Sequence, residues 1–108
     1  MSDRELLQRF KETGSEAAFR ALVDRYAGLV FAVALRRIGN RSVAEEVVQS
    51  VFMILAAKAG RLKTPGELAP WLHRTTLLEA SNAARKESTR QKKMEELVEM
   101  TENVADPN

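Results

Sequence analysis

Few residues in this chain have types and spacing suited to catalysis. His73 is the only histidine, there is no cysteine, and no serine nucleophile motif accompanies the histidine. Glu45 and Glu46 are adjacent, so on a helix their carboxylates point about a third of a turn apart and cannot share a proton. The five glycines lack the spacing of a phosphate-binding loop. We therefore expect that the chain is not an enzyme and uses no metal or other cofactor.

Charged side chains offer a second kind of chemistry, because they are unevenly distributed. Residues 85–93 carry five cations against one carboxylate, whereas residues 94–108 carry five carboxylates and no cation. The formal net charge of +2 hides this contrast. A basic block is typical of proteins that contact nucleic-acid phosphates. On charge alone, however, the favoured interpretation is a solvated helix face whose cations pair with the glutamates that follow at helical spacing.

Capping residues predict where the first helices begin and end. Ser2 with Glu5 forms a capping box, and Gly14 ends the helix that follows. Ser15 opens the next helix, which Gly39 ends. No stretch shows a sustained period-two alternation or a hairpin turn, so we predict no strands and an all-α fold.

A third helix is predicted over residues 42–60, with Ser42 and Glu45 as a second capping box. In the second and third helices, apolar residues recur at three- and four-residue spacing, so each set shares a face that must be buried. These residues are Phe19, Leu22, Val23, Tyr26, Val30, Val33, Ala34, Val47, Val48, Val51, Phe52 and Leu55. A chain of 108 residues holds one such core. We predict a compact helical bundle of three principal helices plus flanking helices.

The stretch from residue 61 to residue 70 is predicted to be a loop. Thr64, Pro65 and Glu67 resemble the cap and first turn of a helix. Pro70 lies too far into such a helix, where its ring would clash with the carbonyl four residues back. The last long helix therefore begins near Glu67, or a short turn precedes it. It contains Trp71, whose ring we expect in the core, and it leads into the basic block.

Two segments are distinguished by composition. Residues 1–93 are predicted to form the folded domain, and residues 94–108 an acidic helix, tail or linker that is frayed from Thr101 onward. Met94, Leu97 and Val98 form a weak apolar stripe in this second segment.

No apolar run approaches the length of a membrane span, and the N-terminus lacks a signal-peptide pattern. We expect a cytoplasmic protein without a membrane span.

The motifs of the chain, taken in order, resemble region 2 of bacterial RNA polymerase sigma factors. An acid-led helix suited to a protein partner is joined by a short loop to a basic helix suited to nucleic acid. The sequence shows GSEAAFRALVDRYAGLVFAVALRRIGN, then AEEVVQSVF, then APWLHRTT, then the basic helix. This order and spacing is most similar to the small extracytoplasmic-function (ECF) type. The resemblance covers about residues 4–93 and implies a sigma region 2-like helical domain.

The resemblance implies a polymerase-binding surface on the third helix. In the family, the segment that matches AEEVVQS docks on the clamp helices of the largest RNA polymerase subunit. The matching positions are Glu45, Glu46, Gln49 and Ser50. Glu46 and Gln49 are three residues apart and share a helix face, where an acid and an amide suit arginine-rich clamp helices. Ser50 replaces the usual acid, which would weaken the contact or shift it onto Glu45.

The resemblance also implies binding to the non-template strand of the −10 promoter element. In the family, the loop matching residues 61–66 takes up a flipped base of the melted element, and the helix after it follows the strand. Leu78 replaces the usual asparagine and cannot hydrogen-bond a base edge, which puts the promoter preference in doubt at that position. The DNA-binding residues implied are Arg61, Lys63, Thr64, Arg74, Asn82, Arg85, Lys86 and Arg90.

Other interpretations remain open. The chain could be a helical protein-interaction domain, in which the basic block only balances the acidic segment, or a DNA-binding regulator of another type that prefers duplex DNA. If the resemblance holds, the complete factor is expected to carry a helix-turn-helix domain beyond these 108 residues. An anti-sigma factor would then be a further partner, since it would cover the same surfaces.

Overall fold

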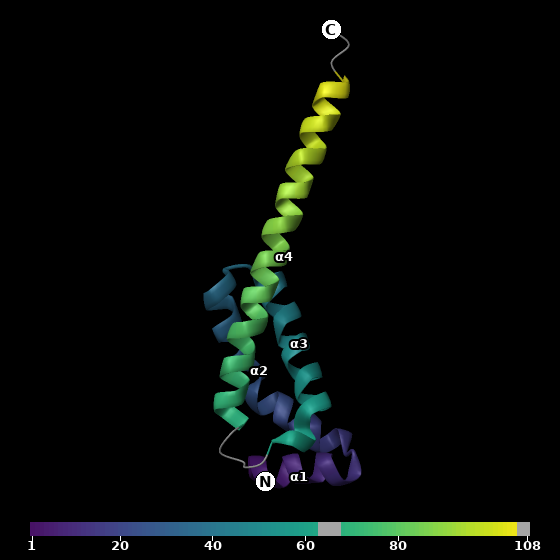
Figure 1. Ribbon diagram of the computed structural model, residues 1–108. Coiled ribbons are helices and arrows are strands. Elements are labelled where there is room, and N and C mark those ends of the chain that lie inside the picture. The colour runs from purple at the N-terminus through teal and green to yellow at the C-terminus, as the bar shows by residue number, and fades with distance from the viewer. Residues whose placement is uncertain (63–67, 106–108) are drawn as a thin grey trace.

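The computed structural model describes residues 1–62 and 68–105, which form α-helices, one turn of 3-10 helix and no strand (Figure 1). α2, α3 and the first half of α4 lie side by side, and α1 packs across one end of this bundle. The predicted all-α fold is therefore confirmed. The elements are α1 (Asp3–Thr13), α2 (Glu16–Ile38), α3 (Arg41–Lys58), η1 (Ala59–Arg61) and α4 (Leu68–Ala105).

The predicted caps of α1 and α2 are confirmed. Ser2 Oγ accepts a hydrogen bond from the backbone N–H of Glu5 at 3.2 Å, and Ser15 caps α2 in the same way. Gly14 and Gly39 end the two helices with φ of 69° and 76°. This left-handed conformation favours glycine and lets the backbone N–H of each close the last helical turn.

The predicted start of α3 at Ser42 is wrong by two residues. The cap is Asn40, whose side-chain oxygen accepts a hydrogen bond from the backbone N–H of Val43 at 3.1 Å. Asparagine is among the best N-cap residues, and Asn40 comes directly after the turn at Gly39. Asn40 therefore caps the helix two residues before Ser42 could do so. Ser42 therefore lies inside the first turn, and the capping box that we predicted there does not form.

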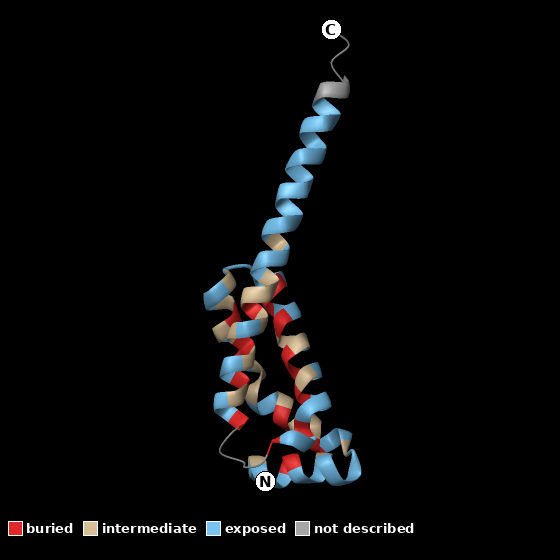
Figure 2. Cartoon of the chain, in the orientation of Figure 1, coloured by how far each residue is buried: buried red, intermediate tan, exposed pale blue. Residues whose placement is uncertain are grey.

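The core lies where the apolar spacing predicted (Figure 2). Buried residues face the axis of the bundle from all of its helices. Phe19, Tyr26 and Trp71 are half-buried and pack against this core, which confirms the expected place of the tryptophan ring. The residues exposed by 2 % or less include Leu22, Val30, Ala34, Ala44, Val47, Val51, Leu55, Leu68, Leu72, Thr76 and Ala80.

α4 is one continuous helix that reaches well beyond the bundle. It runs through residues 101–105, which we expected to be frayed, and no break marks residue 94. Pro70 lies in its first turn, where a helix needs no backbone N–H donor, so the clash that we anticipated does not arise. The molecule consequently measures 70 × 25 × 20 Å.

The predicted cap at Thr64 falls outside the described residues. Within the described part of the chain, no helix is long and apolar enough to cross a membrane.

A polar cluster joins α1 to α2. Asp3 accepts hydrogen bonds from the Tyr26 hydroxyl and from the Arg25 guanidinium. Arg25 also donates to the backbone carbonyl of Met1 at 2.7 Å. The hydrogen bond to Asp3, with smaller effects of burial and of the Asp3 charge, raises the pKa of Tyr26, and Arg25 partly opposes this. The cluster therefore favours the protonated phenol and fixes α1 across the end of the bundle.

We predict that Phe52→Ala lowers the free energy of unfolding by about 3–5 kcal/mol, because it leaves a cavity in the core. Phe52 is 6 % exposed. Met53, the next residue along α3, is 73 % exposed, so Met53→Ala is a matched control that should change stability by less than about 0.5 kcal/mol. Urea unfolding followed by circular dichroism measures both. Equal losses in the two variants would mean that α3 is rotated relative to its orientation here.

The Tyr26–Asp3 hydrogen bond should make stability depend on alkaline pH. A pKa that folding raises contributes stability that is complete below the unfolded value, about 10, and is lost as the pH rises through the folded value. We expect the wild type to lose stability over this alkaline range more than Tyr26→Phe does. Tyr26 is the only tyrosine, so its ultraviolet absorbance reports its titration directly. Identical pH profiles in the two proteins would contradict this assignment.

Candidate functional site

The outward face of α3 carries the predicted protein-binding residues. Glu45, Glu46 and Gln49 are exposed and Ser50 is half-buried. Val47 and Val51, on the opposite side of the same helix, are 2 % and 0 % exposed. The burial of this apolar stripe therefore fixes which side chains α3 presents to solvent.

Glu45 is engaged within its own helix. Its carboxylate lies 3.5 Å from the Nε atom of Arg41, one turn earlier, and both side chains are largely exposed. Such an exposed pair contributes little to stability. The Arg41 guanidinium also lies over the ring of Phe31 on α2, 5.6 Å from its centroid. A partner that bound Glu45 would have to compete with Arg41, whereas no ion pair of Glu46 is seen among the described residues.

Glu46 and Ser50 line a cleft between α3 and α4 with a volume of about 160 Å³. Lys86 and Arg90 line the same cleft from α4, together with Asn82. The structure thus brings together two groups of residues that the family resemblance assigns to different partners. No sequence pattern indicated this proximity, because the two groups are more than thirty residues apart and meet only through the packing of α3 on α4.

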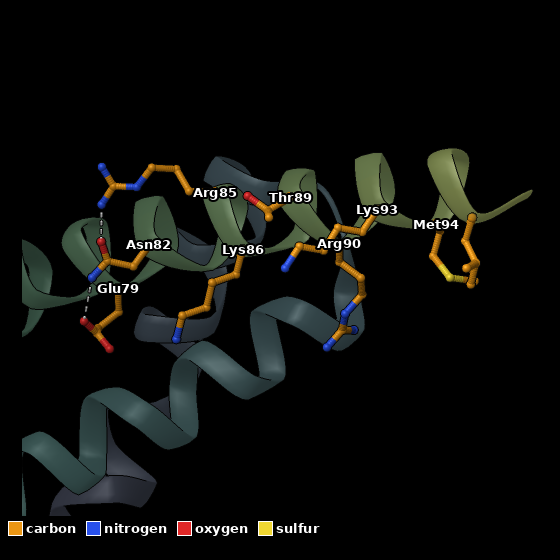
Figure 3. Close-up of a pocket in the computed structure, with 9 residues that line it drawn as sticks. Glu79, Asn82, Arg85, Lys86, Thr89, Arg90, Lys93 and Met94 are labelled. Carbon is orange, nitrogen blue, oxygen red and sulfur yellow. Dashed lines mark hydrogen bonds between the residues drawn. The ribbon is translucent and has the colours of Figure 1, made fainter. Parts of the chain in front are cut away.

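Four of the five predicted DNA-binding residues of α4 fall along one hollow of about 800 Å³ (Figure 3). Asn82, Arg85, Lys86 and Arg90 all line it. In Figure 3, Lys86 and Arg90 extend toward α3, while Arg85 turns to the other side of α4. The cations therefore cover a wide sector of the helix and form a broad positive surface.

A hydrogen-bonded chain of side chains runs along this hollow. Asn82 Nδ2 donates to the Glu79 carboxylate at 3.3 Å, and the Arg85 guanidinium donates to Asn82 Oδ1 (Figure 3). The amide of Asn82 is thus held between an acid and a cation, which orients it. Sequence reasoning missed Glu79, although its position three residues before Asn82 was a usable signal for contact on one helix face. Glu87, which lies 3.9 Å from Arg90, is a second acid within the basic surface.

The remaining predicted residues are more dispersed. Arg74 is exposed on α4, and Arg61 is exposed in η1. Lys63 and Thr64 lie outside the described residues, so the base-binding role of the loop stays a prediction. Leu78 is 60 % exposed on α4. In residues 1–62 and 68–105, no cluster of three or more histidine, aspartate or glutamate side chains could hold a metal ion.

Sequence comparison identifies the family. Residues 22–90, which include all of α3 and the bundle part of α4, match sigma-70 region 2. The chain belongs to the sigma-70 region 2 family. The predicted resemblance is therefore confirmed.

A curated relative shows the same affiliation. The chain is 32 % identical over 79 residues to a protein named RNA polymerase sigma factor CarQ from Myxococcus xanthus. The match covers 73 % of this chain and 42 % of the relative, so the region 2 chain spans less than half the length of that protein. No solved structure matches the chain at a significant level.

The cap at Asn40 stabilises the start of α3, which leads to a prediction. Asn40→Ala should lower the free energy of unfolding by about 1 kcal/mol, because the N–H of Val43 loses its acceptor. Ser42→Ala should have a much smaller effect, because the serine lies inside the first turn and does not cap the helix. Thermal and urea unfolding of the two variants measure the difference. A larger loss in Ser42→Ala would restore the capping box at Ser42 and Glu45.

Proposed function

We propose that this domain binds core RNA polymerase through α3, and recognises and melts the −10 promoter element through α4, as part of an ECF-type sigma factor. The observation that carries the proposal is the family match over residues 22–90, which includes both the exposed acid and amide face of α3 and the cationic hollow of α4. The proposed role of both surfaces is binding.

The chemistry of α3 supports a cationic protein partner. Glu46 and Gln49 are exposed on a rigid helix whose opposite face is buried. A carboxylate accepts charge-assisted hydrogen bonds from arginine, and an amide can donate and accept beside it. We propose the clamp helices of the largest polymerase subunit as this partner, with Glu45 contributing after it leaves Arg41.

The chemistry of α4 supports a single nucleic-acid strand. Arg74, Arg85, Lys86 and Arg90 would follow the phosphates. The Asn82 amide would meet a base edge by exchanging its hydrogen bonds to Glu79 and Arg85 for bonds to the base. Leu78 offers only an apolar contact where the family usually has an asparagine, so selectivity would rest on the loop of residues 61–66.

The polymerase surface can be tested by a double substitution. Glu46→Arg with Gln49→Ala should reduce affinity for core polymerase at least tenfold, because a charge-assisted contact is worth roughly 1.5–3 kcal/mol. Binding is measured by fluorescence anisotropy of the labelled domain, and circular dichroism should show unchanged helix content.

A matched control is available on α1. Glu12→Arg with Gln8→Ala makes the same chemical change at two exposed positions outside the family match. It should leave polymerase binding unchanged. Undiminished binding of the α3 variant would remove the docking assignment and favour a helical interaction domain with another partner.

The DNA surface can be tested through salt dependence. Arg85→Ala with Lys86→Ala should weaken binding to all single strands about equally. It should also flatten the dependence of log affinity on log salt by roughly 0.7 for each phosphate that no longer has a cation beside it. Arg9→Ala with Arg20→Ala removes two exposed cations from α1 and α2, and should leave the slope unchanged.

Exchanging residues within the loop 61–66 should instead alter the preferred base. Equal affinity for single-stranded and duplex DNA, with polymerase present, would exclude the melting role.

A further inference from the structure

A further hollow lies on the side of α4 that faces α2. It has a volume of about 320 Å³. Val33, Arg36 and Arg37 line it from the last turns of α2, and His73 and Leu77 line it from α4, which packs against α2 (Figure 1). Neither the sequence pattern nor the family resemblance assigned a partner to any of these five residues.

This hollow holds positive charge without the acids that accompany the other cations of α4. Its described lining includes two arginines and no carboxylate. The cleft between α3 and α4 contains Glu46, Glu79 and Glu87 beside its cations, and the large hollow contains Glu79. Neither Arg36 nor Arg37 forms an ion pair among the described residues. An anion that enters the hollow between α2 and α4 is therefore opposed by no carboxylate of this lining.

The two arginines are arranged to donate hydrogen bonds. Arg37 is tied to α4, because its Nη2 atom donates to Ser81 Oγ at 3.2 Å. A guanidinium has five N–H donors, so most of those on Arg37 remain available. Arg36 is exposed and lines the same hollow. Together the two guanidiniums offer the forked donors that suit a phosphate group.

The other side chains of the hollow are aliphatic or aromatic. Val33 and Leu77 are half-buried, and the imidazole of His73 is exposed. Aliphatic groups beside a flat ring suit the face of a nucleobase, which stacks well and needs no hydrogen bond there. The volume is close to the lower limit of small-ligand sites, so the hollow suits one nucleotide unit.

We propose that this hollow binds one nucleotide of a single DNA strand. Its phosphate would lie on Arg36 and Arg37, and its base would lie against Val33, Leu77 and His73. The inference rests on the proposed function and extends the DNA surface from α4 onto the end of α2.

Arg74 connects the hollow to the proposed DNA surface. It precedes Leu77 by three residues, so the two side chains are neighbours on α4. Arg85 follows Arg74 after about three helical turns, which places both on one line along the outer face of α4. Arg74 is also the predicted cation of α4 that does not line the large hollow. A strand that passes from Arg85 to Arg74 would thus reach the hollow beside α2.

The single histidine provides a direct test. His73 is the only histidine, so its imidazole C–H signals in an NMR spectrum report on this hollow alone. We expect a short single-stranded oligodeoxythymidine, added to the intact 108-residue chain at low salt, to shift these signals until they saturate. A strand that binds without moving them would overturn the proposal. An oligoglutamate peptide that moves them as strongly as the strand does would also overturn it, and would favour an acidic protein partner.

Substitution of the arginines tests the phosphate contact. Arg36→Ala with Arg37→Ala should weaken binding of the oligodeoxythymidine at least about tenfold and remove the shift of the His73 signals. Arg9→Ala with Arg20→Ala removes two exposed cations elsewhere and should change neither.

A lysine pair separates the phosphate contact from helix stability. Arg36 and Arg37 lie in the last turn of α2, where cations also stabilise the helix end. Arg36→Lys with Arg37→Lys keeps this charge but loses the forked donors, so it should leave urea unfolding unchanged and still weaken the strand severalfold.

Failure of this inference and failure of the proposed function give different results. If the Arg36 and Arg37 variants bind the strand as well as the wild type, while Arg85→Ala with Lys86→Ala weakens it, the nucleotide subsite is overturned and the α4 surface stands. If no single strand binds at any concentration and the His73 signals stay unmoved, both are overturned.

Discussion

The contact between α3 and α4 is the constraint on which the rest of the structure depends. Val51 and Leu55 of α3, and Leu72 of α4, are each exposed by 1 % or less, so neither helix can rotate without opening the core. Thr76 is also fully buried, and its hydroxyl donates to the backbone carbonyl of Leu72 at 2.6 Å. The buried Thr76 hydroxyl thus keeps a hydrogen-bond partner. Among the described residues, no buried side-chain donor or acceptor lacks one. Because the inward faces are fixed, the outward faces are fixed as well.

Local chemistry explains why much of the fold could be predicted from the sequence. Helix ends depend on a few neighbouring residues, so Ser2, Gly14 and Gly39 identified them correctly. The apolar spacing of α3 indicated its buried face for the same reason. The helix start was wrongly predicted at Ser42 because two nearby residues could each cap the helix. Asn40 and Ser42 are both good caps, and only the turn at Gly39 decides that the first of them is used.

The site was less predictable, because it depends on contacts between distant segments. The sequence and the family resemblance supplied Glu46 and Lys86 as separate residues with separate roles. Their common cleft requires the packing of α3 on α4, which no local pattern encodes. The sequence also left open whether α4 continues past residue 93. The composition changes sharply at residue 94, but glutamate, lysine and methionine are all good helix formers, so a change of charge does not end a helix.

The shared cleft between α3 and α4 would link its two walls thermodynamically. Glu46, Glu79 and Glu87 contribute a negative potential within a space that Lys86 and Arg90 also line. A cationic group that engages Glu46 would neutralise part of that potential, and the two α4 cations would then attract an anion more strongly. By reciprocity, an anion held by Lys86 and Arg90 would strengthen the hold of the cleft on a cationic group at Glu46 by the same factor. Two ligands of opposite charge would thus bind cooperatively across a small gap, with no change in the shape of the protein.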